Sequence, residues 1–429
     1  MEGMADLKDR TLELVTKGYR FTDRLLGSAV RPGSARRAPM KLLGSPALVV
    51  RGAEGVRLFY DTERMQRTGA MPAIIGGGLF GKGSLHGMDG EEHRNRKAIF
   101  VRAAMDPDAL RELMADAQRE WTAYIDREWV AGEGGTVYDA AVDVYGRSIL
   151  RWAGIEADEG TLTRLSRWEA QIVDGFAVLG PAYVLQKVRR RQCDSWFEEH
   201  VRRARAGEVP VRPGSALDLV LAHRELDGQP LSDHLAAVEI QNVVRPTIAV
   251  ARFAAFLALA FHEHPDVRER VSDEVVARGT TVDGPYATAV SQEVRRYYPF
   301  VPVLPAVARH DLEFEGARVA GGERVLVDIF GTNRDAEHWS EPDRFDPERF
   351  TGDGADLAWS DHFLPQGGGR PETGHRCPGE LVTVGLLALT AAELSRLDAN
   401  LPEQDLSYPM HRMPTAPVSK VRFVDVRRR

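Results

Sequence analysis

The chain has 429 residues, of which 43% are hydrophobic and 28% are charged, and its formal net charge is −7. This length exceeds the usual size of a small domain, so the chain can bury a core large enough to enclose a cofactor. The slightly acidic balance gives no general attraction to nucleic acid or to anionic membranes, and neither is an expected partner.

Helical periodicity dominates the chain, because apolar residues recur at spacings of three and four. Strand signals are short and scattered, while residues 333–350 and 365–376 carry the proline, glycine and charge of long connections. With no repeat and no long linker, residues 1–429 are expected to form one mainly α domain with small β-sheets. In chain order, the predicted elements are a strand at Ala47–Arg51, a helix at Asp108–Arg127, a strand at Thr136–Tyr138, helices at Asp158–Asp174, Ser232–His264, Pro265–Val276 and Tyr286–Tyr297, and strands at Leu312–Phe314, Arg324–Asp328 and Val421–Val424.

The sequence also indicates a compartment. Its start, MEGMADLKDR, lacks the apolar core of a signal peptide. The longest strongly apolar run, Phe253–Phe261, is far shorter than the roughly 20 residues that span a bilayer. Two cysteines, Cys193 and Cys377, cannot build a disulfide framework. We expect a cytosolic protein without a membrane span.

The segment around Cys377 is the most informative part of the chain. It reads Phe363-Leu-Pro-Gln-Gly-Gly-Gly-Arg-Pro-Glu-Thr-Gly-His-Arg-Cys377-Pro-Gly-Glu, and a helical pattern follows from Glu380. Its glycines allow close approach to a flat ligand. A cysteine just ahead of a helix is expected to have a lowered thiol pKa, which suits an axial ligand of iron. A buried structural cysteine is the plain alternative.

Two further motifs precede this segment. Glu293 and Arg296 lie three apart and so share a helix face, and Asp346-Pro-Glu-Arg349-Phe follows. In this order, E-x-x-R, P-E-R-F and G-H-R-C-P-G together resemble the cytochrome P450 family, from Tyr60 onward. The resemblance implies a helical prism with small β-sheets around a buried haem b, whose iron Cys377 would hold. It also implies that Glu293, Arg296 and Arg349 form a buried ion-pair triad that fixes the cysteine loop.

The sequence departs from the main family in one long helix. Most members carry an acidic residue and a threonine there, which deliver protons to iron-bound oxygen, whereas this chain has Arg245 and Pro246. Proline inside a helix costs about 3 kcal/mol, and a buried arginine needs a carboxylate, preferably bidentate. If no protein residue supplies that carboxylate, the substrate can. An arginine that reaches solvent beside an incidental kink is the alternative.

Arg245-Pro246 and the lengthened glycine loop are similar to the bacterial fatty-acid peroxygenases, a branch of this family. This resemblance implies oxidation of a long-chain fatty acid by hydrogen peroxide, without an obligatory redox partner. The substrate carboxylate, clamped by Arg245, would serve as the acid–base group. Attack would fall at Cα or Cβ, which gives 2- or 3-hydroxy acids or, after decarboxylation, terminal alkenes plus CO2.

The resemblance also assigns the remaining site residues. His86 stands where hydroxylating members carry glutamine and where alkene-forming members carry histidine, so it is expected to donate a proton to the carboxylate or to hold it. A His86 that only hydrogen-bonds the carboxylate is the alternative. Gln366 would lie near the thiolate. Cations matching haem-propionate positions are Arg67, His93, Lys97 and His375, and apolar residues that would hold the alkyl chain are Leu79, Phe80, Val173, Phe176 and Phe300.

Three other functions remain open from the sequence. The first is a conventional monooxygenase that receives electrons from NAD(P)H through a redox partner, which Arg245 and Pro246 disfavour. The second is a haem-binding or fatty-acid-binding protein without activity. The third is an enzyme with a structural Cys377 and no haem.

Overall fold

Helices form most of the molecule, a computed structural model that describes residues 7–176, 178 and 180–429. The first six residues lie outside the described residues, and they include part of the N-terminal segment that was compared with a signal peptide. The helices are α1 (Thr11–Lys17), α2 (Asp23–Leu26), α3 (Gly52–Tyr60), α4 (Ala73–Leu79), α5 (Gly90–Ala104), α6 (Pro107–Tyr124), α7 (Val137–Trp152), α8 (Glu159–Asp174), α9 (Pro181–Arg205), α10 (Ala216–Ala222), α11 (Asp233–Ala249), α12 (Ala251–Glu263), α13 (Pro265–Arg278), α14 (Pro285–Tyr297), α15 (Ile329–Thr332) and α16 (Glu380–Ser395).

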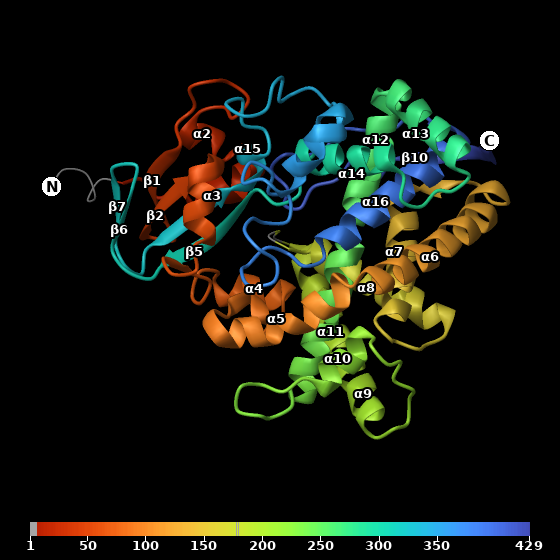
Figure 1. Ribbon diagram of the computed structural model, residues 1–429, viewed down its shortest axis with the longest axis horizontal. Helices are drawn as coiled ribbons and strands as arrows, with labels where there is room; N and C mark the ends of the chain where they lie inside the picture. Colours follow the sequence, from red (N-terminus) through yellow and green to blue (C-terminus); the bar gives the residue numbers. More distant parts are fainter. Residues whose placement is uncertain (1–6, 177, 179) are drawn as a thin grey trace.

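Three small sheets complete the fold. The largest has the strand order β1-β2-β8-β5-β3, in which only β2 and β8 are parallel, and it lies to one side of the long helices (Figure 1). The others have the orders β4-β10-β9 and β6-β7. The strands are β1 (Arg37–Leu42), β2 (Ser45–Val50), β3 (Met65–Gln66), β4 (Gly135–Thr136), β5 (Val303–Ala308), β6 (Leu312–Phe314), β7 (Ala317–Val319), β8 (Arg324–Asp328), β9 (Leu397–Asn400) and β10 (Arg422–Arg428).

Local sequence explains several helix ends. The Asp106 side chain accepts hydrogen bonds from two backbone N–H groups of the first turn of α6, and Pro107 follows at the first helical position. Asp158 and Ser232 cap α8 and α11 in the same way. Gly279, in the left-handed conformation with φ 66°, ends α13. These caps lie within three residues of the predicted boundaries.

Two predicted elements need correction. Thr136–Tyr138 is not a strand throughout: β4 ends at Thr136, whose side chain caps α7, and Val137 already lies in that helix. The single helix predicted at Ser232–His264 is two helices, α11 and α12, which meet at Val250. Pro246 lacks an N–H group and therefore cannot donate to the carbonyl four residues earlier, which weakens the helix at this point.

The main hydrophobic core lies among α7, α11, α12 and α16, whose residues are nearly all buried. The stretch Asp233–Glu263 is long and apolar enough to cross a membrane, but 89% of its most apolar window is buried inside the protein. It runs through the middle of the helical region (Figure 1). This is the position of a core helix.

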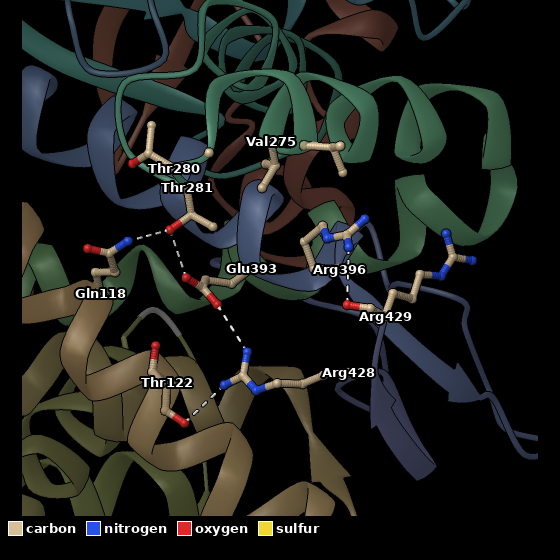
Figure 2. Close-up of a pocket in the computed structure, with 11 residues that line it drawn as sticks. Gln118, Thr122, Val275, Thr280, Thr281, Glu393, Arg396, Arg428 and Arg429 are labelled. Atoms are coloured by element: carbon tan, nitrogen blue, oxygen red, sulfur yellow. Dashed lines mark hydrogen bonds and ion pairs between the residues drawn. The ribbon is translucent and has the colours of Figure 1, made fainter.

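A polar pocket lies at the C-terminal end of α16 (Figure 2). Glu393 accepts a hydrogen bond from Thr281 Oγ1 at 2.8 Å, and one of its carboxylate oxygens lies 3.8 Å from Arg428 Nη1. Burial raises the pKa of Glu393. Because Cys377 precedes α16 and a 16-residue helix is about 24 Å long, this pocket is distant from the cysteine loop.

Candidate functional site

The cysteine loop places Cys377 three residues ahead of α16, as the sequence predicts. The backbone N–H of Cys377 donates to the carbonyl of Gln366 at 3.0 Å. The Gln366 amide donates to Thr383 Oγ1 at 2.9 Å and lies 3.9 Å from Cys377 Sγ. Gly367 has φ 101°, and a Cβ atom there would lie 3.0 Å from the Tyr60 hydroxyl. The loop therefore needs glycine at this position.

A buried carboxylate ties this loop to α14. Glu380, in the first turn of α16, accepts from Arg376 Nε at 2.7 Å and also from Arg295 Nη2. All three side chains are buried. Arg376, the neighbour of Cys377, also donates to the carbonyl of Ala358 at 2.8 Å. Charge-assisted hydrogen bonds between Arg376, just before Cys377, and Glu380, three residues after it, thus fix the position of the cysteine.

The structure confirms the predicted triad. Arg296 forms a bidentate pair with Glu293, with N–O distances of 2.6 and 2.7 Å, and Arg349 Nε lies 3.7 Å from the same carboxylate. Arg296 also donates to the carbonyl of Asn333 at 3.2 Å, and the Asn333 side chain accepts from the backbone N–H of Leu364 at 2.6 Å. The triad therefore supports the start of the cysteine loop through Asn333.

Replacing Glu293 with alanine is expected to destabilise the protein by about 3–5 kcal/mol, because Arg296 would be left buried without its counter-ion. Urea denaturation followed by circular dichroism measures this loss. Asp108→Ala is a matched control, since Asp108 and Arg111 form a pair with the same spacing on the surface. We expect no measurable change for the control. Equal midpoints for the two variants would contradict a supporting role for the triad.

Basic side chains gather beside the loop. His93 and Lys97 share the buried face of α5. Lys97 donates to the backbone carbonyls of Gly374 and Arg376. The rings of His93 and His375 stack at 4.2 Å, and His375 Nε2 lies 3.4 Å from an Asp89 oxygen. Burial lowers the pKa of His93 to about 3 and that of Lys97 to about 8.

Arg67 lies at the edge of this group. It donates from Nη2 to the carbonyl of Phe59 at 3.1 Å, and its guanidinium lies 4.1 Å from the centre of the Phe59 ring. Its backbone N–H donates to the Asp89 carboxylate at 2.9 Å. Burial lowers the pKa of Arg67. Because the pKa values of His93 and His375 are lowered, Arg67 and Lys97 supply the positive charge beside Asp89, and the two imidazoles can add hydrogen bonds to a bound anion.

Arg245 is buried in α11, and Pro246 follows it inside the helix. The structure corrects one premise of the sequence analysis, because a protein carboxylate does reach Arg245. Glu169 Oε2, from α8, accepts from Arg245 Nη1 at 3.2 Å, and Asn242 Oδ1 accepts from Nη2 at 2.7 Å. Pro246 is exposed although Arg245 and Thr247 are buried. The sequence could not show this, because Glu169 lies 76 residues before Arg245.

His86 lies in a short turn before α5 and stacks on Phe80, with ring centres 4.0 Å apart. Its ring has accessible surface, yet burial lowers its pKa to about 3, aided by the charges of Arg245 and Lys97. His86 is neutral at neutral pH, and it links the Arg245 side of the site with the cations beside the cysteine loop.

The other apolar residues assigned to the site lie on separate elements. Leu79 ends α4 and is half-buried, Val173 is buried in the last turn of α8, and Phe176 is half-buried in the turn that follows. The ring of Phe300 stacks on Phe253 of α12 at 4.7 Å. Because Phe253 belongs to the main hydrophobic core, Phe300 packs against that core.

The comparisons with known proteins agree with this geometry. The family model described as Cytochrome P450 matches residues 188–413. This is more than half of the chain. The chain belongs to the cytochrome P450 family.

Solved cytochromes P450 cover almost the whole chain. A variant of cytochrome P450SP alpha (CYP152B1) is 33% identical, with a TM-score of 0.88, over 98% of this chain and 99% of that chain. A variant of cytochrome P450 OleT in complex with arachidonic acid is 31% identical, with a TM-score of 0.89, over 99% of each chain. Wild-type cytochrome P450EX alpha (CYP152N1) with myristic acid is 32% identical, with a TM-score of 0.86, over the full length of both chains. These matches confirm the resemblance to the fatty-acid peroxygenase branch.

As a cytochrome P450, the chain binds a haem whose iron is held by a cysteine thiolate. The residues present fit this group, since a cysteine on a glycine-rich loop lies close to the basic side chains of Arg67, His93, Lys97 and His375. One expectation about the thiol is wrong. Burial raises the pKa of Cys377, and the Gly379 backbone N–H offsets this only in part. The protein alone therefore does not favour the thiolate, whereas coordination to a metal deprotonates a thiol.

Proposed function

We propose that this cytochrome P450 uses hydrogen peroxide to oxidise long-chain fatty acids at Cα or Cβ, by 2- or 3-hydroxylation, by decarboxylation to terminal alkenes, or by both. The observation that carries the proposal is the buried Arg245 beside Pro246, where other members carry an acidic residue and threonine. A buried guanidinium with N–H groups to spare is suited to a carboxylate. Two of the solved relatives contain arachidonic or myristic acid, which supports a fatty-acid substrate.

The haem, held by Cys377, supplies the oxidising chemistry when peroxide is bound. Arg245 has five N–H donors, and Glu169 and Asn242 accept from two of its nitrogens. The remaining donors can hold a fatty-acid carboxylate. Cleavage of hydrogen peroxide into a transferable oxygen atom and water moves one proton from one peroxide oxygen to the other, and the held carboxylate can carry that proton on one of its oxygens. Because the carboxylate is fixed at Arg245, Cα and Cβ are the first carbons of the chain beyond it.

His86 is assigned to the same carboxylate. Its pKa of about 3 means that it is a neutral imidazole at working pH, so it contributes a hydrogen bond rather than a positive charge. The ring of Phe80 stacks on it and fixes its orientation. We propose that this hydrogen bond helps to hold the acid so that oxidation at Cβ ends in loss of CO2.

The test uses the haem-loaded protein with a panel of saturated long-chain fatty acids and hydrogen peroxide, without reductase or NAD(P)H. Gas chromatography–mass spectrometry identifies the products. Terminal alkenes one carbon shorter are expected, with or without 2- and 3-hydroxy acids. Hydroxy acids alone would keep the peroxygenase function and exclude decarboxylation. Turnover only with a redox partner would show a conventional monooxygenase, and binding without any product would show a binding protein.

His86→Gln is expected to shift products from alkene to hydroxy acid by several-fold, because glutamine keeps a hydrogen-bonding group but changes its position. The ratio of alkene to hydroxy acid is measured at a fixed peroxide concentration, and total turnover should change less than the ratio. His200→Gln is a matched control, since His200 is a buried histidine that stacks on Trp196 of its own helix. An unchanged ratio in His86→Gln would contradict the role of His86.

A further inference from the structure

The carboxylate that contacts Arg245 is held in an incomplete arrangement. Glu169 is fully buried, and only its Oε2 atom has a partner, the Arg245 guanidinium at 3.2 Å. Its Oε1 atom is buried and has no hydrogen-bond partner among the residues that the structure describes. A buried carboxylate oxygen without a donor is costly. Arg245 is therefore the group that compensates the Glu169 carboxylate among the described residues.

The charges around Glu169 come from two neighbouring helices. Arg245 lies on α11, and α9 contributes Cys193 together with Arg190 and Asp194, which pair at 2.8 Å. The charged groups thus comprise two cations and two carboxylates, so they are neutral together. Gln241, which donates to Asp194 at 3.0 Å, has a buried Oε1 without a donor in the described structure. The charged cluster around Glu169 therefore has two acceptor oxygens without a donor among the described residues, Glu169 Oε1 and Gln241 Oε1, when one more proton arrives.

The other helices that pack against α8 add no charge here. On α7, Asp143 pairs with Arg167 at 2.7 Å and Arg147 pairs with Glu120 at 2.8 Å. The sequence of α4, AIIGGGL, contains no titratable residue. On α11, Glu239 lies beyond Asn242, accepts from its amide at 3.1 Å and is paired with Arg96 at 3.3 Å. The balance around Glu169 is therefore set by α9 and by Arg245.

A fatty-acid carboxylate at Arg245 would upset this balance. It would add a third carboxylate to two cations, in a buried place where like charges repel strongly and cannot both remain ionised. Resting on the proposed function above, we propose that Glu169 is a proton-accepting counter-ion of Arg245: it is the ionised partner in the free enzyme and takes up one proton when a fatty-acid carboxylate binds. The proton comes from solvent, and the unpartnered Oε1 is the atom that receives it.

Two features favour this uptake of a proton by Glu169. Burial already raises the pKa of Glu169, while Arg245 and Arg190 lower it. A ligand carboxylate that shares Arg245 weakens the lowering of the Glu169 pKa by this arginine, whereas the raising of the pKa by burial remains. While Glu169 is ionised in the free enzyme and protonated in the complex, the Kd of the ligand should rise by up to about 10-fold for each unit of increasing pH.

The test measures proton uptake directly. Myristate is titrated into the haem-loaded enzyme in buffers of different ionisation enthalpy, and isothermal titration calorimetry gives the number of protons exchanged. About one proton should be taken up by the wild type and close to none by Glu169→Gln. Glu393→Gln is the matched control, because Glu393 is also a buried carboxylate of raised pKa but lies in the distant pocket of Figure 2. It should behave as the wild type does.

A second measurement needs no variant. Infrared difference spectra of the wild type with myristate should show a new protonated-carboxyl band that does not move when the ligand carboxylate carries carbon-13. Binding of myristate without proton uptake, or equal uptake by Glu169→Gln, would overturn the role of Glu169 and leave the proposed function standing. Absence of any myristate binding would overturn both.

Discussion

Arg245→Leu is expected to lower kcat/KM for long-chain fatty acids by more than about 100-fold. Bidentate, charge-assisted hydrogen bonds to a carboxylate contribute about 3 kcal/mol or more, and the variant loses them all. The measurement is peroxide-driven turnover at several fatty-acid concentrations. Arg245→Lys should be intermediate, because lysine keeps the charge but lacks the planar fork that holds a carboxylate in one orientation.

The chain offers a control for general damage. Arg252 is also a buried arginine on the helical stretch that contains Arg245, and it pairs with Asp174, again on α8. Arg252→Leu should destabilise the fold without the same loss in kcat/KM of the folded fraction. Since Arg245→Leu leaves Glu169 without its partner, the double variant with Glu169→Gln separates this effect from substrate binding. Normal fatty-acid turnover by the double variant would refute the clamp.

The fold could be predicted where a segment has an apolar face and a polar face that alternate with a clear period. The structure confirms amphipathic helices such as α8 and α14 to within one or two residues, and the strands β6 and β8 at their predicted bounds. Helix α7 was not predicted, although Asp139, Asp143, Arg147 and Arg151 recur every four residues along it, because its start was taken for a strand. Helix α9 was not predicted either, since its 25 residues carry many charges and few apolar positions.

The contacts of the site were likewise predicted only in part. Motifs close together in the chain, such as Glu293 with Arg296, gave contacts that the structure confirms. Contacts between distant segments did not follow from the pattern, as Glu169 with Arg245 and Arg295 with Glu380 show. Glu169 lies four residues after Leu165 and three before Ile172, so the helical period places it on the buried face of α8, although its partner Arg245 does not follow from that period. The raised pKa of Cys377 was missed for a related reason, since the sequence showed the helix N-terminus but not the depth of burial.

Cys377→Ala is expected to abolish the ferrous–CO spectrum that is characteristic of a thiolate ligand, because alanine cannot coordinate iron. Peroxide-driven turnover should fall to the background of free haem. The measurement is the position of the Soret band of the reduced, CO-bound protein, with circular dichroism to show that the fold persists. We expect the fold to persist, since Glu380, Arg376 and Arg295 hold the loop without using the thiol.

Cys193→Ala is the matched control, and it distinguishes the two cysteines by the same substitution. Cys193 lies in the interior of α9, where burial holds its thiol pKa well above the usual value, and the nearby cations Arg190 and Arg245 are already paired with Asp194 and Glu169. Its loss should leave the thiolate spectrum unchanged. If the spectrum survived in Cys377→Ala but disappeared in Cys193→Ala, the assignment of Cys377 as the iron ligand would be wrong. Because Cys377 alone follows a glycine-rich loop beside His93 and Lys97, we expect the opposite pattern.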